Sequence, residues 1–360
     1  MVFLYGIGFI ASILLAVILT PAVKRFAFFV GAVDKPNQRK VHTRIMPRLG
    51  GLAVFLAFVG AFFIIAPMVE DINWRVASAL LIGGSMIVLV GALDDRFDLS
   101  PKTKLLVELL AAFVIVFYGD IQIDLVNMPF GDEFETKWLS VPLTIFWIVG
   151  VTNAVNLIDG LDGLAAGVSG IANGTMLVMA IMMGNVTVIL FSALLLGSIV
   201  GFLVYNFHPA KIFMGDSGAL FLGFCLATLS VLGFKQATLV SFVVPLLILG
   251  VPLSDTFFAI VRRKVNKLPI SVADKNHLHH CLLQLGFGHR NTVLVIYGIS
   301  LFFGLCAILL SQTSQWVALV LVGIIMLVLQ VGAEAIGIVS KSKRPVLNLF
   351  LRVRSKNVSK

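Results

Sequence analysis

Charged residues are scarce in this sequence. Asp, Glu, Lys and Arg make up 12% of its 360 residues, where soluble domains have about 25%. With 59% hydrophobic residues and a mean hydropathy of +1.03, the chain has too little polar surface for a water-soluble fold. The same composition excludes a disordered chain, and the lack of a short sequence period excludes a fibrous repeat. A membrane is the solvent that remains.

Cysteine is scarce too, and the three cysteines lack the paired spacing of zinc sites or disulfides. Cys225 and Cys306 lie in apolar runs and Cys281 in a basic segment, so we interpret all three as packing residues. The first apolar run, 2–22, lacks a basic segment before it and a small-residue cleavage site after it. We therefore expect a retained membrane span there, not a signal peptide.

Long apolar runs, in contrast, are frequent. A helix needs about 20 apolar residues to cross a bilayer core, and alternating barrel strands would give a different pattern. Eleven spans are expected, near residues 2–22, 49–68, 76–93, 105–118, 139–155, 164–183, 186–205, 218–234, 237–258, 292–310 and 315–339. The sequence predicts an all-α polytopic membrane protein, with one transmembrane catalytic domain (1–340) and a basic cytoplasmic tail (341–360).

The basic residues sort to one side of these spans. Of the 27 Lys and Arg residues, 24 fall in the segments 24–48, 94–104, 206–217, 259–290 and the tail. The positive-inside rule therefore predicts that these segments lie on the cytoplasmic side of the cell membrane, with the N-terminus outside the cell and the C-terminus in the cytoplasm. The tail has seven basic residues and no acidic one, which favours anionic membrane lipids, and not nucleic acid, as its partner.

Aspartates cluster on the predicted cytoplasmic side, close to helix ends. Carboxylates at the edge of a bilayer need pairing, hydration or a cation, so such a cluster indicates a functional site. Asp94 and Asp95 end the third span, and adjacent carboxylates favour Mg²⁺, a nearby base or a shared proton. Lys102 and Lys104 follow in an expected loop, where they could neutralise phosphate oxygens.

Asn156, Asp159 and Asp162 form a second polar group, between the fifth and sixth spans. Their spacing of three residues predicts one turn of helix that directs them to one side, while Gly160 and Gly163 permit close approach of a ligand. The structural alternative is an ordinary turn, since Asn, Asp and Gly are common turn residues.

Asp216 is flanked by Gly215 and Gly218 and stands at the entrance to the eighth span, ten residues after Asn206. A helix cap and a Mg²⁺ ligand are both open roles for its carboxylate. The predicted loop 262–290 carries Arg262 and Arg263, then three histidines, His277, His279 and His280.

This loop is typical of phosphate binding. Zinc is an alternative ligand of the histidines, but the nearby acids favour Mg²⁺. Carboxylates for a hard cation, bases for phosphates and a location at the membrane surface predict phosphoryl transfer between a nucleotide and a lipid.

These stretches, together with a first loop (34–51) that includes Arg44, resemble the polyprenyl-phosphate N-acetylhexosamine-1-phosphate transferases of glycosyltransferase family 4. The resemblance covers nearly the whole chain. It implies that the phosphate of undecaprenyl phosphate attacks the β-phosphate of a UDP-sugar and releases UMP. It also implies a requirement for Mg²⁺, for which Mn²⁺ could substitute.

The resemblance implies roles for individual residues. Asp216 matches the metal ligand, and Asp94 and Asp95 match the pair that deprotonates the lipid phosphate or assists the metal. Asp159 and Asp162 match further catalytic positions in the nucleotide and sugar-phosphate region. With the basic residues selected above from their charge, the candidate substrate-binding residues are Asn156, Asn206, Lys104, Arg44, His277, His279, His280, Arg262 and Arg263.

Two departures bear on the substrate. Ile158 and the sequence His-Leu-His-His at 277–280 differ from the branch that makes lipid-linked muramyl-pentapeptide, and resemble the branch that uses UDP-GlcNAc. We therefore expect undecaprenyl-pyrophosphoryl-GlcNAc as the product, in the first membrane step of a cell-wall glycopolymer of the teichoic acid type. A homodimer and downstream membrane-associated glycosyltransferases are further expected partners.

Other readings stay open at this point. The phospho-N-acetylmuramoyl-pentapeptide transferase reaction, a two-step route through an aspartyl-phosphate, a secondary transporter and a non-catalytic lipid-binding scaffold are the alternatives. A transporter would place acids near the bilayer midplane, and Glu108 and Glu334 are the only acids deep in apolar runs.

Overall fold

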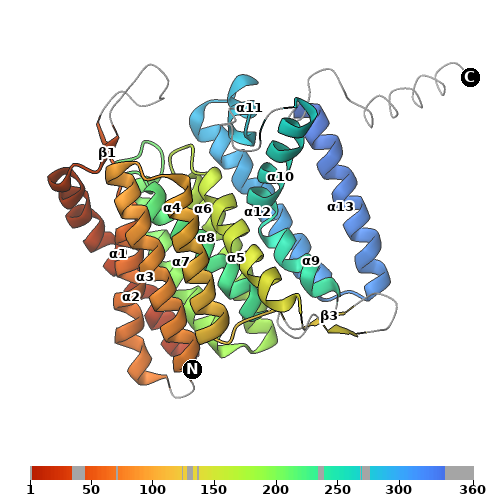
Figure 1. Cartoon of the computed structure of the whole chain (residues 1–360), viewed down its shortest axis with the longest axis horizontal. Coiled ribbons are helices and arrows are strands. Elements are labelled where there is room, and N and C mark those ends of the chain that lie inside the picture. Colours follow the sequence, from red (N-terminus) through yellow and green to blue (C-terminus); the bar gives the residue numbers. More distant parts are fainter. Residues whose placement is uncertain are drawn as a thin grey trace, which may run out of the picture.

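A computed structural model describes residues 2–34, 45–69, 72–123, 125–127, 133–135, 138–233, 239–267, 269 and 276–336. It is mostly helical, with the helices running side by side in a bundle (Figure 1). Arg44 and the tail 341–360 lie outside the described residues.

The helices differ widely in length. Their bounds are α1 Val2–Val30, α2 Gly50–Ile65, α3 Trp74–Phe97, α4 Pro101–Phe113, α5 Ser140–Leu157, α6 Leu164–Met183, α7 Val186–Asn206, α8 Gly215–Gly233, α9 Leu239–Ile248, α10 Gly250–Val265, α11 Leu278–Gln284, α12 His289–Ser311 and α13 Gln315–Ile336. A 3₁₀-helix (Ala66–Met68) follows α2, and a π-helix (Val114–Tyr118) follows α4. Two antiparallel pairs complete the fold: β1 (Val33–Asp34) with β2 (Met46–Pro47), and β3 (Leu125–Asn127) with β4 (Glu133–Glu135).

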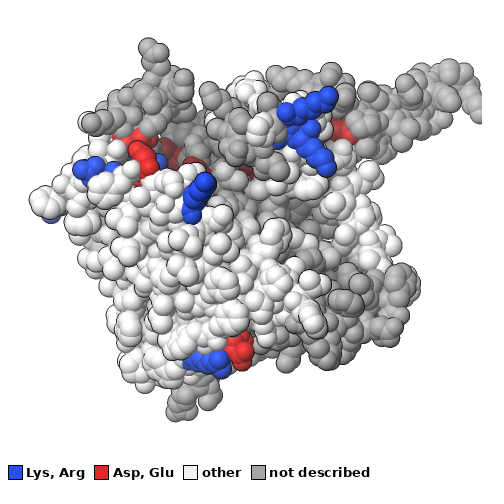
Figure 2. Space-filling view, in the orientation of Figure 1, with Lys and Arg blue, Asp and Glu red and all other residues white. Residues whose placement is uncertain are grey.

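Eight helices in the described part of the chain are long and apolar enough to cross a membrane: α1, α2, α3, α5, α6, α7, α8 and α12. On the face shown in Figure 2, charged side chains gather along two opposite edges and leave an uncharged band between them. The chain is therefore a multi-pass membrane protein, as the sequence predicts. The other three expected spans coincide with α4 and its π-helix, with α9 and α10, and with α13, so a total of eleven stays a prediction.

Parts of two predicted loops are helical. The expected span 237–258 is divided at Leu249, and α10 then continues to Val265, so Arg262 and Arg263 lie in a last helical turn, where cations are favourable. Pro252 fits the first turn of α10, where its missing N–H costs no hydrogen bond. Lys104 lies on α4, because the Ser100 side chain accepts a hydrogen bond from Thr103 N (3.3 Å) and starts that helix early.

Helix α8 lies at the centre of the bundle and packs against α3 and α5, while α7 packs against α1 and α6. Large aromatic side chains fill the core; Phe62 and Phe191 stack with ring centroids 5.5 Å apart. The two acids within apolar runs bind neighbouring side chains: Glu108 accepts from the Asn153 amide, and Glu334 accepts from Gln330 at 2.9 Å. The Glu108 contact joins α4 to α5, whereas the Glu334 contact lies within α13.

Backbone contacts join the loop before α2 to the loop before α8. Gly50 N donates to Phe213 O (3.0 Å), Gly51 N donates to Met214 O (2.8 Å), and Phe213 N donates to Pro47 O (2.9 Å). The first N–H groups of a helix have no partner within the helix, so these carbonyls satisfy the start of α2. They also bring Arg48 to the end of the bundle where α3 ends and α8 begins, which we call the polar end.

Candidate active site

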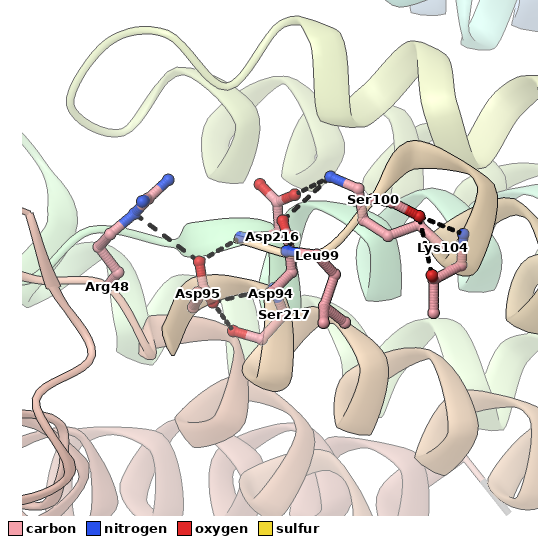
Figure 3. Close-up of polar contacts among 9 residues, drawn as sticks. Arg48, Asp94, Asp95, Leu99, Ser100, Lys104, Asp216 and Ser217 are labelled. Carbon is pink, nitrogen blue, oxygen red and sulfur yellow. Dashed lines mark hydrogen bonds and ion pairs between the residues drawn. The ribbon is translucent and has the colours of Figure 1, made fainter. Parts of the chain in front are cut away.

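Asp95, near the end of α3, binds the first turn of α8. Its Oδ1 accepts a hydrogen bond from Asp216 N (2.9 Å), and its Oδ2 accepts from Ser217 N (3.2 Å) and Ser217 Oγ (2.9 Å) (Figure 3). The Asp95 side chain is 0% exposed. A carboxylate at a helix N-terminus is stabilised by the free N–H groups and by the helix dipole. Asp95 is thus the cap of α8, supplied by another helix.

Two glycines permit this contact. A Cβ at Gly91, one turn before Asp95, would clash with the backbone of Ser217. Gly215 has a φ of +71°, and a Cβ there would collide with the Arg48 carbonyl. A residue with a side chain at either position would push α3 and α8 apart, and the Asp95 carboxylate would lose the α8 amides.

The Lys104 ammonium joins Asp94 to Asp216. Lys104 Nζ lies 3.0 Å from Asp94 Oδ2 and 2.7 Å from Asp216 Oδ2 (Figure 3). The other oxygen of Asp94 accepts a hydrogen bond from Leu99 N at 2.7 Å. The side chains of Asp94, Asp216 and Lys104 remain 11%, 19% and 21% exposed, so this group, unlike Asp95, is accessible from solvent.

The oxygens around Lys104 suit a divalent cation. Asp94 Oδ2 and Asp216 Oδ2 converge on one positive charge, and carboxylate oxygens are the ligands that Mg²⁺ prefers in proteins. The residues present therefore fit a Mg²⁺ ion, with Asp216 as its expected ligand and Asp94 beside it.

Arg48 and Asp159 lie near this group and differ in charge. Arg48 Nε lies 3.8 Å from Asp95 Oδ1. Burial lowers the pKa of Arg48, but Asp95, Asp34 and Asp216 raise it by more, so the guanidinium keeps its charge. Burial of Asp159, together with the negative charges of Asp216 and Asp95, raises its pKa to about 8. At neutral pH the Asp159 carboxyl is therefore mostly protonated.

Asp162 is held by the loop after α7 and by the first residue of α12. Its Oδ2 lies 2.9 Å from His208 Nδ1 and accepts a hydrogen bond from Ala210 N (3.1 Å), and its own N–H donates to His289 Nε2 (3.0 Å). The Asp162, His208 and His289 ligand atoms all lie within 4.8 Å of one another, a spacing that would allow a metal ion. Because the Asp162 N–H already uses the His289 Nε2 lone pair, we interpret this group as a hydrogen-bonded support for the loop.

The expected helical turn over 156–162 is not formed. Asn156 lies in the last turn of α5, which ends at Leu157, and Asp159 and Asp162 follow in the loop before α6. Gly163 has a φ of +76° and directs the chain into α6, so the turn interpretation holds for this segment. Asn206 ends α7, where its buried amide donates to Ile212 O (2.9 Å) and orders the loop that leads to Asp216.

The histidine segment 277–280 lies beside the 159–163 loop. His277 Nδ1 is 2.7 Å from Asp255 Oδ2, and the rings of His277 and His279 stack with centroids 6.0 Å apart. A side chain at Gly160 would collide with the His279 imidazole. Burial, with His280 next to it, lowers the pKa of His279 to about 4, so this ring is neutral at pH 7.

The structure thus brings Asp94, Lys104 and Asp216 together and places Asp159 near them, as expected. Four residues with clear structural contacts were not predicted as site residues: Ser217, His208, His289 and Asp255. Their partners lie between 22 and 127 residues away in the sequence. For His208, its place beside Asn206 and before Asp216 was the available signal.

Comparisons with known proteins identify the family of this chain. The model of the family described as "Glycosyl transferase family 4" matches residues 77–234, a range that contains Asp94, Asp95, Asp159, Asp162 and Asp216. The chain is 47% identical over 353 residues to the "Probable undecaprenyl-phosphate N-acetylglucosaminyl 1-phosphate transferase" of Bacillus subtilis (strain 168), covering 98% of this chain and 97% of the relative.

Two further relatives have lower sequence identity to this chain. The "Decaprenyl-phosphate N-acetylglucosaminephosphotransferase" of Mycobacterium tuberculosis (strain CDC 1551 / Oshkosh) is 36% identical over 310 residues, covering 77% of this chain and 75% of the relative. The "Phospho-N-acetylmuramoyl-pentapeptide-transferase" of Staphylococcus carnosus (strain TM300) is 29% identical over 316 residues, covering 83% and 95%. The 47% identity to the Bacillus subtilis relative covers almost the full chain, and the family model matches the range that contains the aspartates. This protein therefore belongs to glycosyl transferase family 4.

Proposed function

We propose that this chain transfers N-acetylglucosamine 1-phosphate from UDP-GlcNAc to undecaprenyl phosphate. An oxygen of the lipid phosphate forms a bond to the β-phosphorus of UDP-GlcNAc, and the bond from that phosphorus to the bridging oxygen breaks, which releases UMP. The observation that supports this most is the Asp94–Lys104–Asp216 group, at the end of membrane-spanning helices in a chain 47% identical to the Bacillus subtilis relative. A nucleotide from the cytosol and a lipid phosphate in the bilayer can meet at such a place.

Asp94 is the better candidate for the base that takes a proton from the lipid phosphate. Both Asp95 oxygens accept hydrogen bonds from α8, and its side chain is closed to solvent. Asp94 is partly exposed, and its Oδ2 faces the Lys104 ammonium. In this role Asp94 receives the proton, while Asp95 holds α8 so that Asp216 stays next to it.

Lys104 and Arg48 supply positive charge to the reaction. Phosphoryl transfer depends mainly on positioning and on neutralisation of the phosphate oxygens. Lys104 would move from the two carboxylates to a phosphate oxygen of the bound substrates. Mg²⁺ bound by Asp216 would neutralise the diphosphate and polarise its phosphorus–oxygen bonds.

We further propose that the polar end faces the cytoplasm, and that the product starts a cell-wall glycopolymer of the teichoic acid type. The sorting of 24 of the 27 basic residues to one side supports the orientation. UDP-GlcNAc is supplied from the cytosol, so this orientation is also the one that the reaction needs.

UMP release by the purified protein tests the reaction. The protein in detergent is incubated with UDP-GlcNAc, with and without undecaprenyl phosphate and with and without Mg²⁺, and UMP is measured. We expect release only when all three are present. UDP-N-acetylmuramyl-pentapeptide is run in parallel, because the Staphylococcus carnosus relative bears the name of that reaction. UMP release from UDP-N-acetylmuramyl-pentapeptide alone would make that compound, and not UDP-GlcNAc, the substrate. No UMP release from either compound would favour a transporter or a lipid-binding scaffold.

The direct route has its own test. Incubation with UDP-GlcNAc labelled in the sugar, without lipid, should leave no label on the protein. A protein-bound phosphosugar on an aspartate would instead establish a two-step route.

A further inference from the structure

We propose that Asp255 is a positioning residue that holds the histidine segment 277–280 against the active-site loop 159–163. This inference rests on the proposed function, because its activity measurements use UMP release. Asp255 lies on α10, outside the Asp94–Lys104–Asp216 group.

Asp255 makes two short contacts to the start of α11. Its Oδ2 lies 2.7 Å from His277 Nδ1, and its Oδ1 accepts a hydrogen bond from Leu278 N at 2.7 Å. His277, the residue before α11, makes no capping bond with its own side chain. The carboxylate of Asp255 therefore caps α11 from α10 and fixes both the backbone and the imidazole of the first histidine.

The surroundings of Asp255 strengthen these bonds. Its side chain is 2% exposed and lines a cavity of about 390 Å³, with apolar neighbours such as Phe258, Val295 and Phe302. Because the Asp255 side chain is 2% exposed, water has little access to its carboxylate, so its hydrogen bonds are strong, and leaving it without partners would be costly. A buried acid at this position is explained by the contact it makes with α11.

Ring contacts continue from His277 towards the active site. His277 and His279 stack almost parallel, with an angle of 5° between their planes, and the His279 and His280 centroids are 4.2 Å apart. His279 in turn lies against Gly160, next to Asp159. A shift of the first histidine therefore displaces the ring that borders the 159–163 loop.

Asp255 also selects the form of the His277 ring. A carboxylate accepts only, so the Nδ1 that faces it carries a proton, and the Nε2 of a neutral ring is left as an acceptor. An amide at position 255 could instead present its NH₂ to Nδ1 and move the ring proton to Nε2. Asp255→Asn thus moves the proton of the His277 ring while the volume of side chain 255 hardly changes. An effect of this substitution therefore reports the positioning of His277 and not a loss of packing.

Steady-state kinetics of UMP release tests this role. Asp255→Asn should lower kcat/KM for UDP-GlcNAc by about 10²-fold, the cost of misplacing a group that orients a substrate, mainly through a higher KM. Asp255→Glu should recover most of the loss, because its added methylene has room in the neighbouring cavity. The matched control is Ser254→Ala, since Ser254 lines the same cavity and bonds to Val251 O of its own helix (3.1 Å); it should behave as wild type.

A double-mutant cycle asks whether Asp255 acts through His277. In the His277→Ala background, Asp255→Asn should cause no further loss of kcat/KM, because the two residues act as one unit. If the two losses multiply, or if Asp255→Asn has wild-type kinetics, the proposal is overturned.

Hydrogen exchange gives a readout that does not depend on turnover. Without substrates, the amides of 278–285 should exchange faster in Asp255→Ala, which removes both contacts to α11, than in wild type, while those of α12 stay unchanged. Unchanged exchange in 278–285 overturns the proposed contact between Asp255 and α11 even if the protein releases no UMP. Failure of this proposal can therefore be distinguished from failure of the proposed transferase function. If Asp255→Ala loosens α12 as well, Asp255→Glu decides: slow exchange at 278–285 with recovered kcat/KM supports the contact between Asp255 and α11, and fast exchange there overturns it.

Discussion

The backbone N–H of Asp216 donates to Asp95 Oδ1 over 2.9 Å, while the Asp216 carboxylate shares Lys104 with Asp94. The two adjacent aspartates of α3 therefore bind Asp216 in different ways, one through its backbone and one through a shared cation. This difference separates a structural role from a chemical one within a single Asp-Asp pair.

Substituting each aspartate in turn should separate the two roles. Asp95→Asn places an NH₂ group or a weaker acceptor against the α8 amides and should destabilise the protein by about 2 kcal/mol. Asp94→Asn should abolish UMP release with a much smaller change in melting temperature. Thermal unfolding in detergent and UMP release, measured on the same preparations, check both. Equal losses of melting temperature in the two variants would contradict this assignment.

Removing the Lys104 ammonium should change how the site responds to Mg²⁺. Without it, Asp94 and Asp216 repel each other and attract a cation more strongly. Lys104→Met should therefore need less Mg²⁺ for half-maximal UMP release, while its maximal rate falls by about 10²-fold because a charge-neutralising donor is lost. Lys102→Met, at an exposed position on the same helix, is the control and should titrate like wild type. An unchanged Mg²⁺ titration in Lys104→Met would show that the Lys104 ammonium does not compete with Mg²⁺ for Asp94 and Asp216.

Removal of the metal should stop the reaction. We expect EDTA to abolish UMP release and added Mg²⁺ to restore it, and Asp216→Asn to be inactive at every Mg²⁺ concentration. Asp98→Asn serves as the control, since Asp98 is exposed at the same end of α3 and has a φ of +50°, which Asn also tolerates. Full activity of Asp216→Asn in saturating Mg²⁺ would remove Asp216 from the proposed metal site.

The raised pKa of Asp159 predicts a pH-dependent stability. Its value is about 8 in the fold, against 3.8 for the unperturbed group, so between these values the folded state holds a proton that the unfolded state has released. Stability must then fall as the pH rises through this window and level off above pH 8. Asp159→Asn lacks this dependence.

Melting temperatures measured from pH 5 to 9, without Mg²⁺ or UDP-GlcNAc, test this prediction. The difference between Asp159→Asn and wild type should grow in favour of the variant up to about pH 8, and then stay constant. A difference that does not change with pH would mean that Asp159 is ionised throughout.

The helices were predictable because each membrane span needs a long apolar run. The range 164–183 matches α6 at both ends, where Gly163 and Gly184 take positive φ values and stop the helical backbone. The division at Leu249 and the extension of α10 to Val265 were not predicted, because a hydropathy run shows neither a break in hydrogen bonding nor a helix that continues beyond the membrane.

The site was predictable in its residue types but not in its pairings. Asp94, Lys104 and Asp216 could be selected because charge near an apolar run is costly. Nothing local marks Asp95 as a cap for α8, or Asp255 as a cap for α11, because both partners come from a different helix. A pattern read along the chain contains no information about which helix ends meet.

The cap between Asp95 and α8 also sets an order of assembly. Asp94 and Lys104 are 10 residues apart, so their contact can form as soon as α4 follows α3 into the membrane. The amides that Asp95 needs arrive 121 residues after it, and the His289 partner of Asp162 arrives 127 residues after that aspartate. During synthesis the acidic end of α3 therefore waits in contact with water until α8 is inserted. A nascent chain stalled before α8 therefore presents the Asp95 carboxylate without the α8 amides that bind it in the finished protein.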